Sequence, residues 1–194
     1  IKIPLLRRTL LTSGIVITGI ELYSFYFPIY GHSIGFSASM IGVVMGVYAA
    51  ASFVIRAILP GLTRKFDEDR VLSYSLFLSG GTFLLFPFFQ DMYLLSLISF
   101  ILGLGLGCGQ PLSIIQTYNR SPQGRSGEAL GMRLTVNKLT QITIPLVFGS
   151  IGSAFGLLPV FWANAFLLLA GGYASVRKIH AEGSEFFEEK GKEG

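Results

Sequence analysis

The stretch 92-MYLLSLISFILGLGLGCGQPLSIIQTY-118 decides the fold, because it contains no aspartate, glutamate, lysine or arginine. A helix of about 20 apolar residues is long enough to cross the ~30 Å hydrocarbon core of a bilayer. Residues 71–89 and 157–176 are likewise free of charged side chains. These three stretches therefore predict membrane-spanning helices.

Three further stretches, residues 9–30, 40–60 and 128–151, are long and apolar but carry scattered polar groups. The whole chain is 51% hydrophobic and only 13% charged, whereas about a quarter of the residues in a soluble domain are charged. The sequence therefore predicts an all-α integral membrane protein with six spans in one domain, residues 1–178. Residues 179–194 are polar and charged, and we expect a disordered cytoplasmic tail there.

The positive charge is confined to one side of the predicted membrane. The connections 31–39, 90–91 and 152–156 hold none of the 15 lysines and arginines. Basic residues in short loops mark the cytoplasmic face, so both termini are expected to be cytoplasmic, in a plasma membrane of the bacterial inner-membrane type. The net charge of +4 is thereby explained by topology and does not indicate a nucleic-acid partner.

Several chemistries are unsupported by the sequence. Cys108 is the only cysteine, which excludes a disulfide or a cysteine zinc site within the chain. His32 and His180 lie outside the predicted spans, and the aspartates lie in predicted connections. Intramembrane serine and aspartyl proteases need such residues within their helices. We therefore predict no enzyme activity, no metal site and no cofactor.

A repeat is visible in the spacing of two prolines. Pro28 and Pro111 are 83 residues apart, and each lies 19 residues after the start of its predicted span. The same offset carries the second and third predicted spans close to the fifth and sixth. A unit of three crossings ends on the far side of the membrane, so its copy enters inverted. We therefore expect two inverted three-helix repeats, a plan common in secondary transporters.

Polar side chains lie along one face of the first, second, fourth and fifth spans, since residues three or four apart share a helical face. We expect these faces to line a polar interior and the third and sixth spans to be peripheral. The candidate contacts with a small solute or proton are Thr18, Glu21, Ser24, Gln110, Ser113, Asn137 and Gln141. The candidate gating or structural residues within the spans are Pro28, Arg56, Pro111 and Arg133.

Glu21 is the sharpest of these candidates. It lies about 20 Å along the helix from Arg8, where a charged side chain costs roughly 2.5–3.5 kcal/mol. It must therefore be protonated, paired or hydrated, which makes it a candidate proton-coupling or cation-binding group. A carboxyl group hydrogen-bonded to a neighbouring helix remains the alternative. The ladder Arg133, Asn137 and Gln141 could likewise contact solute or join helices.

The glycines of residues 103–109 superficially suggest a phosphate-binding loop. They follow no predicted strand and lie within an apolar helix, which argues against nucleotide binding. Gly103 with Gly107, and Gly105 with Gly109, instead form two faces that permit close helix approach.

The connection 60-PGLTRKFDEDRVL-72 resembles the motif between the second and third helices of each half of a major facilitator superfamily transporter. Leu62, Lys65, Phe66 and Arg70 fit that motif, while Arg64 replaces its usual aspartate. Residues 37–42 with Arg56, and residues 125–145, also resemble the carboxy-terminal half of the family. The resemblance implies a twelve-helix transporter whose amino-terminal half is absent here, with Lys65 and Arg70 at a gating loop.

The resulting hypothesis is a secondary transporter that moves a small solute by alternating access, as a symporter or antiporter, with proton coupling. The chain begins at Ile1 without a methionine, from which we expect a longer protein. The alternative is a complete six-helix transporter or channel subunit that acts as an oligomer. The expected partners are the small solute, the bilayer and the missing half.

Overall fold

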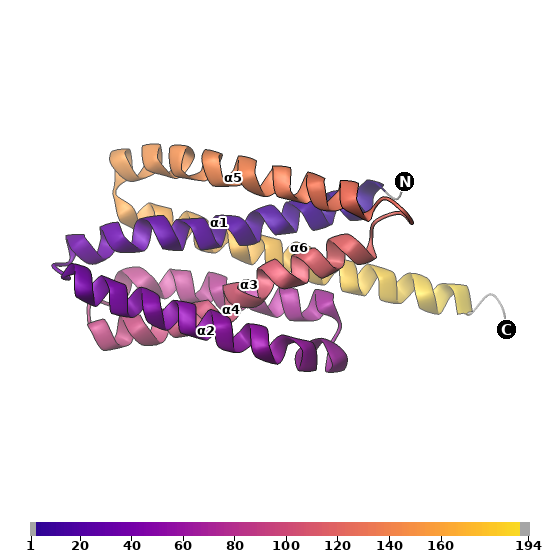
Figure 1. Ribbon diagram of the computed structural model, residues 1–194, viewed down its shortest axis with the longest axis horizontal. Helices are drawn as coiled ribbons and strands as arrows, with labels where there is room; N and C mark the ends of the chain where they lie inside the picture. The colour runs from indigo at the N-terminus through magenta and orange to yellow at the C-terminus, as the bar shows by residue number, and fades with distance from the viewer. Residues whose placement is uncertain (1–2, 191–194) are drawn as a thin grey trace.

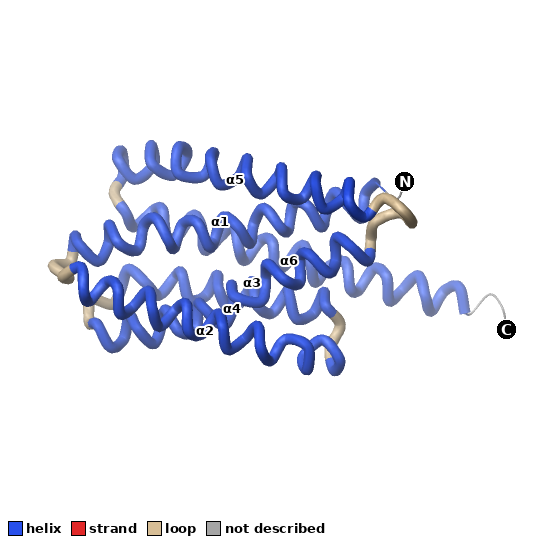
Figure 2. Tube along the Cα trace, in the orientation of Figure 1, coloured by secondary structure: helices blue, strands red, loops and turns tan. Residues whose placement is uncertain are grey.

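The computed structural model describes residues 3–190, and the described part is built from helices without a strand (Figures 1 and 2). Connections between the helices are short, as Figure 2 shows in tan. The elements in chain order are α1 (Ile3–Ser33), α2 (Ala38–Lys65), α3 (Glu68–Leu85), the 3-10 turn η1 (Phe86–Phe88), α4 (Met92–Asn119), α5 (Ser126–Phe155) and α6 (Leu157–Lys190).

Among the described residues, five helices are long and apolar enough to cross a membrane. The apolar segments are Leu6–Ser33, Ala38–Lys65, Glu68–Phe88, Met92–Asn119 and Leu157–Val176. The predicted span 128–151 falls within α5 but is absent from this set; even its apolar part contains Asn137, Lys138 and Gln141. The 30 residues of α5 nevertheless reach about 45 Å at 1.5 Å per residue, more than the thickness of the hydrocarbon core.

The sixth helix is longer than the sequence predicts. Residues 177–190 continue α6 as a helix, and this end extends beyond the other helices (Figure 1). The predicted tail of residues 179–194 thus begins within this helix, its disorder stays a prediction, and residues 191–194 lie outside the described part. Alanine, glutamate and lysine are strong helix formers, and no proline interrupts the segment.

Four helices form the centre of the bundle. α1 packs on α4 and α6, and α3 packs on α4 and α6, so that these four helices close a ring. The other two are attached on the outside, α2 mainly to α4 and α5 mainly to α1. In Figure 1, α5 and α2 accordingly lie at opposite edges of the bundle, with α1 between them.

Burial follows this arrangement and differs from the expectation for the third and sixth spans. In the most apolar part of each helix, 56% of α3 is buried inside the bundle, compared with 17% of α2. The physical reason is that α3 and α6 pack extensively on each other, so within this chain they are not peripheral. The outward faces of α2 and α5 are largely apolar, with exposed Phe53, Ile58, Leu139, Ile142 and Leu146.

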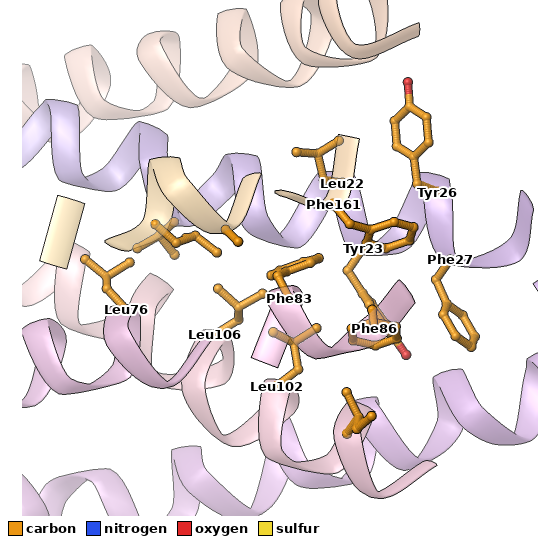
Figure 3. Close-up of a cluster of buried hydrophobic side chains, with 14 of the residues drawn as sticks. Leu22, Tyr23, Tyr26, Phe27, Leu76, Phe83, Phe86, Leu102, Leu106 and Phe161 are labelled. Carbon is orange, nitrogen blue, oxygen red and sulfur yellow. The ribbon is translucent and has the colours of Figure 1, made fainter. Parts of the chain in front are cut away.

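Aromatic side chains fill the core at one end of the bundle (Figure 3). Phe86 and Phe161 are stacked with ring centroids 5.7 Å apart. Phe27 meets Phe86 edge to face at 5.8 Å, and Tyr23 stacks on Phe27 at 5.1 Å. Such contacts stabilise by about 0.5–1.5 kcal/mol each beyond their burial, and here they join α1, η1 and α6.

The glycines of α4 are placed where other helices approach closely. A Cβ on Gly103 would collide with the backbone of Tyr48 in α2, and one on Gly107 would lie 2.7 Å from the Cα of Ser52. A Cβ on Gly105 would collide with Ser79 of α3, and one on Gly109 would lie 2.5 Å from Val16 of α1. The two predicted small-residue faces are therefore packing surfaces for three different helices.

Candidate functional site: the polar face of the bundle

Glu21 lies half-exposed on α1. Its carboxylate makes no hydrogen bond or ion pair with any residue in the described part of the chain. Tyr48 of α2 is within electrostatic range of both Glu21 and Arg56. The Glu21 carboxylate is therefore a hydrogen-bond acceptor without a bonded partner, and it lies near Tyr48 of the adjacent helix α2.

Tyr48 and Tyr23 form an aromatic pair beside this carboxylate. Their ring centroids are 4.3 Å apart, and the ring planes are tilted by 30°. The Tyr23 hydroxyl donates to Ser99 Oγ of α4 at 3.0 Å. Sequence reasoning missed Tyr48, although its spacing of four residues from Ser52 and eight from Arg56 places all three on one helical face.

Arg56 and Ser52 attach α2 to the glycine face of α4. Arg56 Nε donates to the carbonyl of Gly107 at 3.1 Å, and the Ser52 hydroxyl donates to the carbonyl of Gly103 at 3.2 Å. These are the glycines whose missing side chains let the two backbones approach. Arg56 remains exposed, so its charge faces the surroundings while one nitrogen is used in packing.

Arg133 is held against α4 by two hydrogen bonds. Its Nε donates to Ser113 Oγ at 2.9 Å, and its Nη2 donates to the carbonyl of Gln110 at 3.3 Å. Only 5% of Arg133 is exposed. Three of the predicted residues, Gln110, Ser113 and Arg133, are thus brought together at the contact between α4 and α5.

The rest of the α5 ladder divides between two partners. The Asn137 amide oxygen accepts from the Ser13 hydroxyl of α1 at 2.9 Å, in a buried position. Gln141 accepts from Lys138 Nζ of its own helix at 3.0 Å. Gln141 is half-exposed and Lys138 is exposed, so this pair lies on the open side of the helix.

The remaining candidates do not join one cluster. Thr18 is buried and its hydroxyl donates to the carbonyl of Gly14, whereas Ser24 is exposed. Pro28 and Pro111 each lie inside a continuous helix, α1 and α4 respectively. The structure therefore distributes these polar groups over buried helix contacts and partly exposed positions rather than in one enclosed cluster.

A separate polar network closes one end of the helix ring, and sequence reasoning did not anticipate it. Arg120 Nη2 donates to both carboxylate oxygens of Asp69, at 2.7 and 2.6 Å, and Arg120 Nη1 donates to Thr9 Oγ1 at 2.8 Å. Gln116 Nε2 also donates to Asp69 at 3.0 Å. The network thus connects α1, α3 and the end of α4.

The predicted gating residues of the neighbouring loop lie outside this network. Arg70 is exposed and pairs with Asp67 at 3.4 Å, and Lys65 is exposed at the end of α2. The sequence did contain a signal for the pair of Asp69 and Arg120. Asp69 lies at the start of the third predicted span and Arg120 directly after the fourth, so both are expected on the same side of the membrane.

Within the described residues, no group of histidine, cysteine, aspartate and glutamate side chains could hold a metal ion.

Comparison with known families agrees with this architecture. The sequence profile of the Major Facilitator Superfamily matches residues 9–192. The match covers nearly the entire chain, so this protein belongs to the Major Facilitator Superfamily and is an integral membrane protein of the transporter class. A search of curated proteins gave no match.

Proposed function

We propose that this chain is one six-helix half of a secondary transporter that moves a small solute by alternating access. The observation that carries the proposal is the lone carboxylate of Glu21 on an open, partly polar face. An intramembrane carboxylate is costly and marks ion or solute pathways. In this proposal Glu21 takes up a proton or binds a cationic solute, in symport or antiport.

The polar groups near the open side supply the proposed solute contacts. Ser24 is exposed, Gln110 and Gln141 are half-exposed, and Ser113 and Asn137 hold the adjoining helices in position. Arg56 and Arg133 are proposed as gating or structural residues, because both bind α4 and join it to the outer helices.

The pattern of helix contacts supports the proposed inverted repeats. Exchanging α1 with α4, α2 with α5 and α3 with α6 converts each main contact either into itself or into another observed contact. The pair α1 and α5 becomes α4 and α2, and the pair α1 and α6 becomes α4 and α3. Such an exchange is expected of two related three-helix units.

The exposed faces of α2 and α5 favour an amino-terminal six-helix half as partner, in a plasma membrane with both termini of this chain cytoplasmic. Exposed apolar side chains there, such as Phe53 and Leu146, would contact that half or lipid. The alternative is an oligomeric six-helix transporter or channel subunit. Six further spans in the upstream coding sequence would support the first proposal and exclude the second.

The test of Glu21 uses the full-length protein. A thermal-shift screen against metabolites and drugs identifies a solute, and transport of that solute is then measured in proteoliposomes with an imposed pH gradient. Glu21→Gln should abolish the response of transport to the gradient while the protein stays folded. Glu128→Gln is the matched control, because it makes the same change at an exposed carboxylate paired with Arg125.

Two outcomes would contradict the proposal. Wild-type transport with unchanged pH dependence in Glu21→Gln would remove Glu21 from the mechanism. An equal loss in Glu128→Gln would attribute the effect to surface charge rather than to the position of Glu21.

A further inference from the structure

A cavity of about 530 Å³ lies between α1, α3, α4 and α6, at the end of the helix ring closed by the Arg120 network. Its volume is within the ~300–1,000 Å³ typical of small-molecule sites. Arg8 lines it and Glu21 does not. The cavity is therefore distinct from the proposed solute face, because its lining on α1 ends at Ile15, six residues or about 9 Å before Glu21.

Its polar lining lies at the boundary of the membrane. Arg8 is near the start of the apolar segment of α1, and Asp69 is the second residue of the segment in α3. Arg120 directly follows the segment of α4, and Ser175 lies near the end of the charge-free stretch 157–176, two residues before Arg177. All four contribute to the cavity, which thus opens at the depth of lipid headgroups.

The charges at this boundary favour an anion. Arg120 and Asp69 neutralise each other through two hydrogen bonds. Arg8 is exposed, and its guanidinium has no ion-pair partner within residues 6–176, whose side chains the structure describes. The Ser175 hydroxyl is half-exposed on the opposite helix and is a further available donor. One uncompensated positive charge and a donor therefore line the polar end.

The other part of the lining is apolar. Leu11 and Ile15 follow Arg8 toward the middle of the membrane, and Tyr173 of α6 also lines the cavity. Leu11 and Tyr173 are 57% and 61% exposed, so this wall is accessible from outside the bundle. A soluble anion gains nothing from such a wall, whereas burying apolar area stabilises an amphiphile by about 25 cal/mol per Å².

We infer that this cavity binds an anionic phospholipid, with its phosphate group at Arg8 and Ser175 and its chains along Leu11, Ile15 and Tyr173. Basic pockets between transmembrane helices are suited to acidic headgroups. The inference concerns a lipid site and does not depend on the proposed role of Glu21.

The test titrates delipidated, full-length protein in neutral detergent with phosphatidylglycerol or phosphatidylcholine and counts bound lipids by native mass spectrometry. We expect one phosphatidylglycerol to bind at least about tenfold more tightly than phosphatidylcholine. Both lipids carry a phosphate, but the choline cation of phosphatidylcholine cancels its charge and is repelled by Arg8. Arg8→Gln should remove this preference. Arg7→Gln is the matched control, because Arg7 is exposed but does not line the cavity.

A second variant tests the apolar part without removing charge. Ala174→Trp places a large side chain in the cavity and should reduce phosphatidylglycerol binding as strongly as Arg8→Gln. Thermal melting verifies that each variant is folded. If one of the two variants does not fold, lipid binding by the other is sufficient to test the inference.

Three results would overturn the inference. Equal affinity for the two lipids would show that no anion is selected. An equal loss of phosphatidylglycerol affinity in Arg7→Gln and Arg8→Gln would indicate a general electrostatic attraction to the surface rather than a specific site. Displacement of phosphatidylglycerol by millimolar inorganic phosphate would identify a site for soluble phosphate instead.

Discussion

Two polar regions of this bundle are built in opposite ways. At one end of the helix ring, Arg120 and Asp69 are only 16% and 18% exposed in their side chains and bind each other, Thr9 and Gln116. On the open face, the carboxylate of Glu21 has no hydrogen-bonded partner among the described residues. A charge whose bonds are satisfied internally contributes to the fold, whereas an unsatisfied charge is available to bind something else.

The largest effect is expected from breaking the closed network. Arg120→Gln leaves Asp69 without its cation and should lower the free energy of unfolding by about 3 kcal/mol. Arg70→Gln removes an exposed pair, with side chains 54% and 75% exposed, and should cost at most about 1 kcal/mol. Unfolding in mixed micelles measures both. Similar losses of unfolding free energy in the two variants would contradict the proposed difference between the closed network and an exposed ion pair.

The second prediction compares a glycine at a close helix contact with a glycine on the exposed surface. Gly103→Ala forces a methyl group against the backbone of Tyr48 and should destabilise by about 1–3 kcal/mol. Gly46→Ala adds the same methyl group to an exposed position of α2 with no atom within 4 Å. There the alanine should stabilise by about 0.5–1 kcal/mol. Thermal melting of the two variants should therefore move in opposite directions.

A third comparison uses two arginines that both bind α4. Arg133→Gln removes two hydrogen bonds at a position 5% exposed and should cost about 2 kcal/mol. Arg56→Gln removes one bond at an exposed position and should cost less than about 1 kcal/mol. A larger loss at Arg56 would show that exposure does not decide the contribution.

The smallest effect on stability is expected at Glu21. Because its carboxylate has no bonded partner in the described structure, Glu21→Gln should change the free energy of unfolding by less than about 0.5 kcal/mol. Urea-induced unfolding of the full-length protein in micelles measures this change. Strong destabilisation would show that Glu21 belongs to the packing of the bundle, and the open face would then lose its distinction from the closed network.

The helices themselves were largely predictable. Span 92–118 corresponds to α4 at Met92–Asn119, because a long charge-free run has few alternatives to a membrane helix. Ser37 before α2 and Asp91 before α4 accept backbone hydrogen bonds from the first turn, which helps to define where those helices begin. The end of α6 was not predicted, since composition alone does not separate a charged helix from a charged coil.

The candidate site was predictable only in part. Helical spacing predicted a shared face of α5 for Arg133, Asn137 and Gln141, but not their different partners on α4, on α1 and within α5. Asp69 and Arg120 are 51 residues apart in sequence, and nothing in local periodicity links them. Tyr48 was overlooked because a tyrosine in an apolar span has no distinctive pattern.

By itself the sequence determined the class of protein, the approximate spans and the glycine faces, because these follow from hydropathy and helical period. Only the tertiary structure decided which helix each glycine meets, which charges neutralise each other and which carboxylate stays free. Those outcomes depend on contacts between residues distant along the chain, where helix packing brings or fails to bring a partner within bonding distance.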